Sequence, residues 1–241
     1  MLQRIMMRLD KFLVSMEVGS RSQVKSILKK GIVTVNGTIC KDADLKINEN
    51  TDKIVYQGRE LSYVKFRYFI LNKPGGVVTA TRDNHDKTVM DLLTDIPKKD
   101  FFPVGRLDKD TEGLLLITND GSLAHALLAP KKHVDKTYFV GLRDLITKEA
   151  VSALESGLDI GEDKPTLPAK VQILSKKEIH LTIQEGKFHQ VKRMLSAVGN
   201  EVIYLKRISF GSLVLEASLK PGAYRELTAE EINKLQKDAG Q

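Results

Sequence analysis

The chain contains one cysteine, no long apolar run and no glycine-rich nucleotide-binding pattern. Cys40, the single cysteine among 241 residues, cannot form an internal disulfide or a cysteine-rich metal site. Apolar runs such as GLLLIT (113–118) are far shorter than the roughly 20 residues that span a bilayer. Neither a Walker A nor a dinucleotide glycine pattern is present, so we expect no cofactor of that kind. The first residues, MLQRIMMRLD, lack the apolar core and cleavage site of a secretory signal, and we therefore expect a cytoplasmic protein.

Charged residues are plentiful but unevenly placed. The formal net charge is +7, and the fractions of hydrophobic (41%) and charged (29%) residues are typical of a globular protein. Residues 1–66 contain 12 Lys and Arg against 7 Asp and Glu, whereas residues 67–241 contain 26 against 24. A small basic segment joined to a nearly neutral body is typical of a polyanion-binding appendage, although a solvated basic surface would have the same composition.

The N-terminal segment predicts two helices followed by a hairpin. Apolar residues recur at helical spacing over 9–16. A second helix is expected after Ser20, which can form a capping box with Gln23. Asn36-Gly37 then follows alternating valines and predicts a tight β-hairpin turn.

The order of these parts resembles the S4 RNA-binding domain, which occurs in ribosomal protein S4 and in several RNA-modifying enzymes. The resemblance rests on RLDKFL followed by SRSQVKSILKKGIVTVNG and covers about residues 7–50. We expect this domain to occupy residues 7–62 and the body of the protein to occupy residues 66–241. The resemblance implies that five cationic side chains line an RNA surface: Arg8, Lys11, Arg21, Lys25 and Lys29.

The body predicts an α+β fold with a largely antiparallel sheet, because strand patterns outnumber helical ones and short turns join several of them. Strands are expected at RYFIL and VVTA on either side of a Pro-Gly-Gly turn, at GLLLIT and at KTYFVGL, and VQILSKKEIHLTIQEG predicts a hairpin. Helices are expected at TVMDLL, SLAHALL and QVKRMLSAVG. A last helix, AEEINKLQ, follows a capping box of Thr228 and Glu231.

Three acidic residues alternate immediately before the apolar GLLLIT segment: Asp108, Asp110 and Glu112. They match the start of a calcium-binding loop, but position twelve of that loop is Asn119 instead of a bidentate glutamate, and apolar residues fill the ligand positions. A two-metal nuclease site needs further carboxylate and histidine ligands, and the five histidines have no ligand spacing. We therefore expect no metal site. The remaining alternatives are a solvated turn, which suits Asp110, and a catalytic carboxylate.

The segment GRLD followed by DTEGLLLITNDG resembles the signature of the RsuA family of pseudouridine synthases, the bacterial rRNA uridine isomerases. LNKPGG precedes it, and KTYFV, EGKFHQVKRM, AVGNEVIYLKR and PGAYRELT follow in the order found in that family. Together with the S4 domain, the resemblance covers nearly the whole chain. It implies a catalytic domain that isomerises uridine to pseudouridine in RNA and needs no cofactor.

The resemblance assigns the catalytic role to Asp108. This residue would attack the target uridine so that the base can detach, rotate and rejoin its ribose through C5; attack at the base and attack at the ribose both remain open. An attacking carboxylate must be ionised, and burial opposes ionisation, so a nearby cation is needed. Lys192 in HQVKRM is the candidate, ahead of Arg193. A phosphate contact or a solvated helix position is the alternative role of Lys192.

The resemblance also implies roles for three further residues. Tyr138 in KTYFV would stack on the target base and help to remove the C5 proton, although a tyrosine in an alternating strand is otherwise typical of the core. Extruding a uridine from structured RNA costs a few kcal/mol, and Arg106 would fill the vacated space. Arg106 lies two residues before Asp108, so an extended segment directs both side chains to one side. Gln190 would form a hydrogen bond in the site.

The expected substrate is 16S rRNA or a small-subunit assembly particle, because MRLDKFL, EGKFHQVKRM and PGAYRELT are most similar to the small-subunit branch of the family. Lys187 and Phe188 stand where relatives often carry Arg and Tyr. These differences affect details of RNA contact and do not affect the expected activity. The alternatives are a synthase that acts on 23S rRNA and a non-catalytic assembly factor; the presence of Asp108, Tyr138 and Lys192 argues against the latter. No oligomerisation pattern is visible, so we expect a monomer.

Overall fold

The structure is a computed structural model, and it describes residues 6–16, 18–48, 51–61, 64–96 and 100–240. The chain divides into two compact units, residues 1–65 and 66–241. The predicted end of the first domain, residue 62, lies outside the described residues. Within the described ranges no helix is long and apolar enough to cross a membrane.

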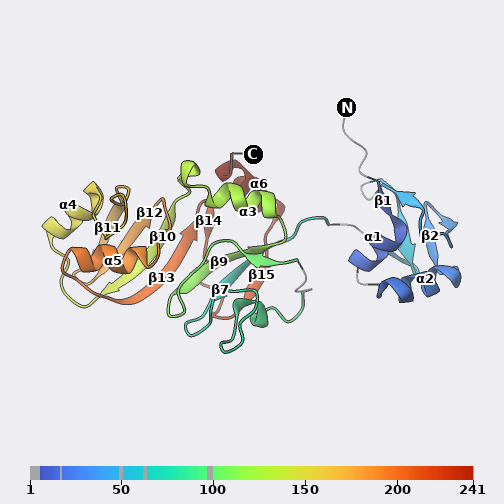
Figure 1. The fold of residues 1–241 in the computed structure, drawn as a ribbon, viewed down its shortest axis with the longest axis horizontal. Coiled ribbons are helices and arrows are strands. Elements are labelled where there is room, and N and C mark those ends of the chain that lie inside the picture. The colour runs from blue at the N-terminus through green and yellow to red at the C-terminus, as the bar shows by residue number, and fades with distance from the viewer. Residues whose placement is uncertain (1–5, 17, 49–50, 62–63, 97–99, 241) are drawn as a thin grey trace. The chain divides into compact units, whose positions relative to one another are not determined.

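The N-terminal unit combines two helices with two small sheets (Figure 1). Its elements are β1 (Met7–Arg8), α1 (Leu9–Ser15), α2 (Arg21–Lys29), β2 (Val33–Val35), β3 (Thr38–Ile39), β4 (Lys46–Ile47), β5 (Ile54–Tyr56) and β6 (Arg59–Leu61). β1 pairs with β4, and the other sheet has the order β3-β2-β5-β6. Apolar side chains of both helices and of β2, β4 and β5 form one core.

The predicted local structure of this unit is confirmed. Ser20 and Gln23 form the capping box that begins α2. Asn36 and Gly37 have φ angles of 51° and 84°, as the two-residue turn of a tight hairpin requires. The sequence therefore determines these elements through short-range interactions.

The second unit is built on a mixed sheet whose described strands run in the order β11-β12-β10-β13-β9-β7-β15 (Figure 1). β8 pairs with β9, and β14 pairs with β13. The strands are β7 (Tyr68–Lys73), β8 (Phe102–Pro103), β9 (Glu112–Thr118), β10 (Lys136–Leu142), β11 (Lys170–Ser175), β12 (Glu178–Ile183), β13 (Val202–Phe210), β14 (Leu213–Val214) and β15 (Tyr224–Glu226). Among the recorded pairings, β9 and β13 run parallel and the others antiparallel. The α+β prediction is confirmed.

The helices pack against the sheet and form two separate apolar cores with it. The helices are α3 (Gly121–Leu128), α4 (Lys148–Ser156), α5 (Gln190–Ala197) and α6 (Ala229–Asp238), with short 3₁₀ turns η1 (Val89–Leu92) and η2 (Pro130–Lys132). Leu114 and Leu116 of β9 pack with α3 and α6, whereas Leu115 and Ile117 belong to the core that contains α4 and α5. β9 is therefore buried on both faces, which explains its unbroken apolar sequence.

Two expectations for the body are corrected. VVTA is not a strand; Val78 forms only an isolated bridge to Thr88. A strand returning from the Pro-Gly-Gly turn cannot pair with β7, because β9 and β15 occupy both edges of β7. TVMDLL forms the single 3₁₀ turn η1. Residues 77–88 instead contact the loop that precedes β9, through Thr79 with Leu107 and through Asp86 with Lys109.

Candidate active site

Asp108 lies in the loop that joins β8 to β9, and hydrogen bonds hold this loop on the N-terminal side of Asp108. Thr79 Oγ1 donates to the Leu107 carbonyl (2.7 Å) and accepts from the Leu107 amide (3.2 Å). The Thr111 amide donates to the Asp108 carbonyl at 3.1 Å, which closes a turn at the entry to β9. The backbone of Asp108 is therefore fixed by its neighbours before any substrate binds.

A buried lysine holds the other side of the same loop. Lys73, at the end of β7, is fully buried, and its Nζ donates to the carbonyls of Pro74 (3.1 Å), Lys109 (3.2 Å) and Thr111 (2.7 Å). Burial lowers the pKa of Lys73 to about 8, while the carboxylates of the loop act in the opposite direction. Lys73 thus ties β7 to the turn that carries Asp108.

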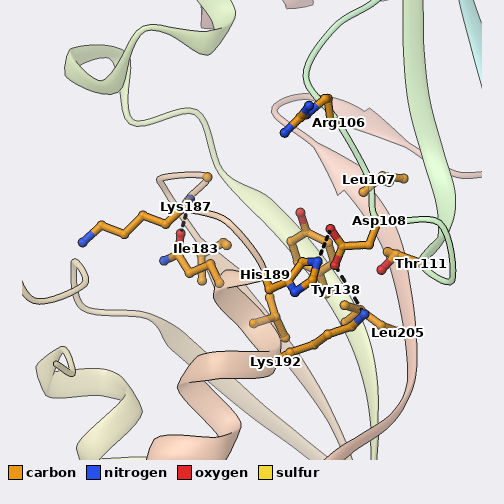
Figure 2. A pocket seen from close by; sticks show the side chains of 13 residues that line it. Arg106, Leu107, Asp108, Thr111, Tyr138, Ile183, Lys187, His189, Lys192 and Leu205 are labelled. Carbon is orange, nitrogen blue, oxygen red and sulfur yellow. Dashed lines mark hydrogen bonds and ion pairs between the residues drawn. The ribbon is translucent and has the colours of Figure 1, made fainter. Parts of the chain in front are cut away.

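Two cationic or titratable side chains from the start of α5 approach Asp108 (Figure 2). Lys192 Nζ lies 3.4 Å from Asp108 Oδ2 and 2.7 Å from Asp110 Oδ1. Burial opposes the charge of Lys192, but the carboxylates of Asp110 and Asp108 raise its pKa above the ordinary value. His189 Nε2 lies 3.6 Å from Asp108 Oδ1. The structure therefore brings Lys192 and Asp108 together.

Arg193, the less favoured candidate, is turned away from Asp108. Its guanidinium donates to the Phe188 carbonyl at 3.1 Å, to the Ile160 carbonyl and to Glu162. These contacts anchor α5 to the loop that follows α4. Lys192 is thus the cation of the HQVKRM segment that faces the carboxylate.

Asp108 and Tyr138 line one cavity of about 80 Å³. Tyr138 comes from β10 and is 8% exposed. Figure 2 shows its ring behind Asp108 and His189, with Leu205 of β13 nearby. A carboxylate beside an aromatic ring in a small cavity suits a planar base.

The three alternating carboxylates do not converge. Asp110 binds Lys192, which lowers the pKa of Asp110. Glu112 accepts a hydrogen bond of 2.7 Å from the Tyr204 hydroxyl. Of the three, Asp108 alone is among the residues that line the cavity. Among the described residues, no group of three or more His, Cys, Asp or Glu side chains is placed to hold a metal ion.

The remaining two predicted site residues, Arg106 and Gln190, differ in exposure and in hydrogen bonding. Arg106 is exposed and lines the same cavity as Asp108. Gln190 is buried, and its amide group accepts from the Lys187 amide (2.9 Å) and donates to Glu185 (2.9 Å). The side chain of Gln190 therefore orders the loop before α5.

His189 was not predicted from the sequence as a neighbour of Asp108. His189 has a φ of 49°, in the left-handed region, and its ring stacks on that of Phe188 with a centroid distance of 3.8 Å. The HQVKRM motif contained the residue, but nothing in the motif indicates a left-handed turn that brings the ring back over the cavity.

In the N-terminal unit the five predicted RNA-binding cations are all exposed: Arg8, Lys11, Arg21, Lys25 and Lys29. Arg8 forms ion pairs with Asp10 (2.7 Å) and Asp44. The three cations of α2 lie on its exposed surface, opposite the buried Val24 and Leu28.

Comparison with known families gives two matches. Residues 67–197 match the RNA pseudouridylate synthase family, and residues 7–52 match the S4 domain. The first match contains the Asp108 loop, Tyr138 of β10 and the start of α5.

Curated relatives match over nearly the full length. The chain is 50% identical over 234 residues to an uncharacterized RNA pseudouridine synthase, YtzG, of Bacillus subtilis, covering 95% of this chain and 98% of the relative. It is 43% identical over 227 residues to ribosomal small subunit pseudouridine synthase A of Vibrio cholerae, covering 94% and 98%. The protein of that name in Escherichia coli is 39% identical over 228 residues, with the same coverage.

A solved structure is similar as well. The crystal structure of a pseudouridylate synthase superimposes with a TM-score of 0.68 and 39% sequence identity, covering 95% of this chain and 99% of that one. Sequence and fold comparisons therefore agree.

Proposed function

The chain belongs to the RNA pseudouridylate synthase family, and we propose that it isomerises one uridine of 16S rRNA to pseudouridine, with Asp108 as the catalytic carboxylate. One observation carries the proposal. Of three alternating acids, Asp108 is the one that lines the cavity, with Lys192 Nζ at 3.4 Å and the ring of Tyr138 in the same wall.

The reaction needs no external group. Asp108 attacks the uridine and forms a transient bond to it, the bond between C1′ and N1 breaks, and the base rotates. C5 then bonds to C1′, and the bond to Asp108 breaks, which restores the free carboxylate. C5 then loses its proton and N1 gains one, so atoms and electrons balance without a redox partner. Lys192 places a positive charge 3.4 Å from Asp108 Oδ2, where it attracts the carboxylate.

The other residues bind and orient the RNA. Tyr138 stacks on the extruded base and helps to remove the C5 proton. Arg106, exposed at the cavity, fills the space that the base leaves in the RNA. Gln190 contributes by ordering the loop before α5, the helix whose start carries His189 and Lys192.

The S4 domain, proposed to extend over residues 7–62, directs the enzyme to its RNA. The names of the Vibrio cholerae and Escherichia coli relatives refer to the ribosomal small subunit, which favours 16S rRNA. The exposed cations of α2 supply attraction to phosphates, which positions the RNA without selecting its sequence.

Mapping of pseudouridine tests this function. The purified protein is incubated, in EDTA, with 16S transcript, 23S transcript and partly assembled small-subunit particles, and pseudouridine is located by carbodiimide labelling and primer extension. We expect one new stop in 16S rRNA that Asp108→Ala abolishes. A stop in 23S rRNA would refute the proposed substrate and keep the chemistry. Tight binding to particles without any stop would mean a non-catalytic assembly factor.

A further inference from the structure

A larger cavity of about 410 Å³ opens beside the one that holds Tyr138. Arg106, Asp108 and His189 line both cavities. A base placed against Asp108 therefore has a second, contiguous space next to it. The volume lies in the range of small-molecule sites and is far more than a water molecule needs.

One wall of this second cavity is apolar and exposed. Phe188 is 64% exposed, and its ring stacks on His189 at an interplanar angle of 19°, so that one face of the ring is covered. Leu128, at the end of α3, is 43% exposed and lines the same cavity. Exposed aromatic rings beside a cationic groove are the usual platforms on which proteins stack unpaired bases.

A different wall carries a buried cation. Lys136, the first residue of β10, is 8% exposed and lines the cavity. Its Nζ donates to the Val134 carbonyl at 3.0 Å and lies over the Phe210 ring, 5.6 Å from the ring centroid; an ammonium group has three donors. Burial and the neighbouring Arg207 lower the pKa of Lys136 to about 8, while the carboxylates of Asp135 and Glu185, the latter in the lining of the same cavity, act in the opposite direction. An anion at this wall would supply both an acceptor and a compensating charge.

We propose that this cavity binds the nucleotide next to the target uridine, with its base stacked on Phe188 and its phosphate directed to Lys136. An aromatic wall and a cationic wall in one space match a nucleotide, and the shared residues make it a neighbour of the reacting base. Phe188 and Lys136 then select RNA in which the flanking nucleotide is also unstacked. This inference rests on the proposed function.

The absence of tryptophan from the chain permits a direct test of stacking. Phe188→Trp introduces a single tryptophan into the proposed subsite, and Leu145→Trp introduces one at an exposed position that lines neither cavity. Titration with 16S transcript should quench the fluorescence of the first variant and leave that of the second unchanged. Equal responses of the two variants would refute the subsite.

The second measurement uses a short RNA that contains the mapped uridine, with each flanking nucleotide in turn made abasic. For the wild type, one of the two abasic RNAs should raise KM about tenfold, with kcat nearly unchanged. Phe188→Ala should raise KM for the intact RNA by a similar factor and show no further loss with that abasic RNA, whereas Phe188→Tyr should behave as the wild type. If Phe188→Ala and the abasic nucleotide together raised KM by the product of their separate factors, the two would act independently and the proposal would be overturned.

The results separate this inference from the proposed function. Pseudouridine formation without quenching of the tryptophan at position 188 would reject the subsite and leave the enzyme's activity established. Quenching in Phe188→Trp without pseudouridine formation would reject the proposed reaction and support the subsite as an RNA-binding cavity.

Discussion

One ammonium group, that of Lys192, lies between the carboxylates of Asp108 and Asp110. It forms its shorter contacts with Asp110, at 2.7 and 2.8 Å, and lies 3.4 Å from Asp108 Oδ2. Asp110 thus holds Lys192 in place while the charge of Lys192 acts on Asp108. This arrangement gives the outer carboxylate a positioning role.

Lys192→Met should therefore lower kcat about 100-fold or more, because Asp108 loses the positive charge beside it. Lys192→Arg should retain much of the activity. Single-turnover kinetics with 16S transcript measures both. If Lys192 were only a phosphate contact, Lys192→Met would raise KM and leave kcat unchanged.

Sequence motifs led to candidate site residues that lie close together in the structure, but they did not indicate the neighbours that packing brings to the site. Asp108, Tyr138 and Lys192 were proposed from their motifs, and the structure brings all three to one cavity. The clamp by Lys73 needs its burial beneath the loop, and the approach of His189 needs a left-handed turn. Neither follows from residue type or spacing.

The parallel contact between β9 and β13 brings two backbones close together at Gly113. This residue has a φ of +103°, and a Cβ atom there would lie 2.2 Å from the Arg207 carbonyl oxygen. Gly113 also follows directly after the acidic loop. The close approach of the strands therefore determines where the loop of Asp108 ends and β9 begins.

Gly113→Ala should lower the free energy of unfolding by about 3 kcal/mol or more, because backbone strain and a backbone clash add. Gly37→Ala is the matched control, since Gly37 has a φ of +84° but nothing within 4 Å of the added atom. It should cost only about 1–2 kcal/mol. Urea denaturation measures the free energy of unfolding of both variants. Equal losses of stability in Gly113→Ala and Gly37→Ala would contradict the close approach of the backbones at Gly113.

The last helix, α6, is joined to β15 by a bidentate ion pair. Arg225 donates to Glu231 Oε1 (2.6 Å) and Oε2 (2.9 Å), and this contact lowers the pKa of Glu231 from 4.5 to about 2. Glu231 therefore binds a proton at a higher pH in the unfolded chain than in the folded chain. The resulting stabilisation is complete above pH 4.5 and is lost as the pH falls towards 2.

Glu231→Gln should lower the free energy of unfolding by about 1–2 kcal/mol at pH 7, after allowance for solvent screening, and should flatten the loss of stability between pH 4.5 and 2. Thermal melts over that pH range measure the effect. Glu230→Gln removes an exposed pair with Lys234 in the same helix and should change little. If Glu231→Gln lost stability between pH 4.5 and 2 as the wild type does, the acid sensitivity would not come from the Arg225–Glu231 ion pair.

Elements that begin or end at a capping box or a turn motif were predictable from the sequence. Elements that depend on strand pairing between distant segments were not. The capping boxes of α2 and α6 and the Asn36-Gly37 turn are short-range features, and all are present. The strand expected at VVTA fails because both edges of β7 are occupied by segments distant in sequence. β13 was not predicted, since its burial alternates irregularly where it changes partners along its length.

The proposed function assigns both units to one RNA: residues 1–65 contain the cations of α2, and residues 66–241 contain the candidate active site. The triple variant Arg21→Gln, Lys25→Gln, Lys29→Gln should raise KM for 16S transcript about tenfold and leave kcat unchanged. It should reduce the dependence of log affinity on log salt by about 2–3, because up to three phosphate contacts are lost.

The matched control neutralises three exposed lysines of the second unit, with Lys148→Gln, Lys176→Gln and Lys220→Gln. This control keeps the same net charge as the first triple variant. Equal changes in KM and in salt dependence for the two triple variants would show a general charge effect, and would contradict an RNA surface on α2.

The release of tritium from 16S transcript labelled at C5 of uridine tests the central claim most directly, because the reaction removes the C5 proton. With enzyme in excess, Asp108→Asn should lower the rate on the order of 10⁴-fold while filter binding shows unchanged RNA affinity. Asp110→Asn, two residues away, should stay within about tenfold of the wild type because Asp108 keeps its charge. Release by Asp108→Asn at a rate near that of the wild type, or its loss only in Asp110→Asn, would contradict Asp108 as the catalytic carboxylate.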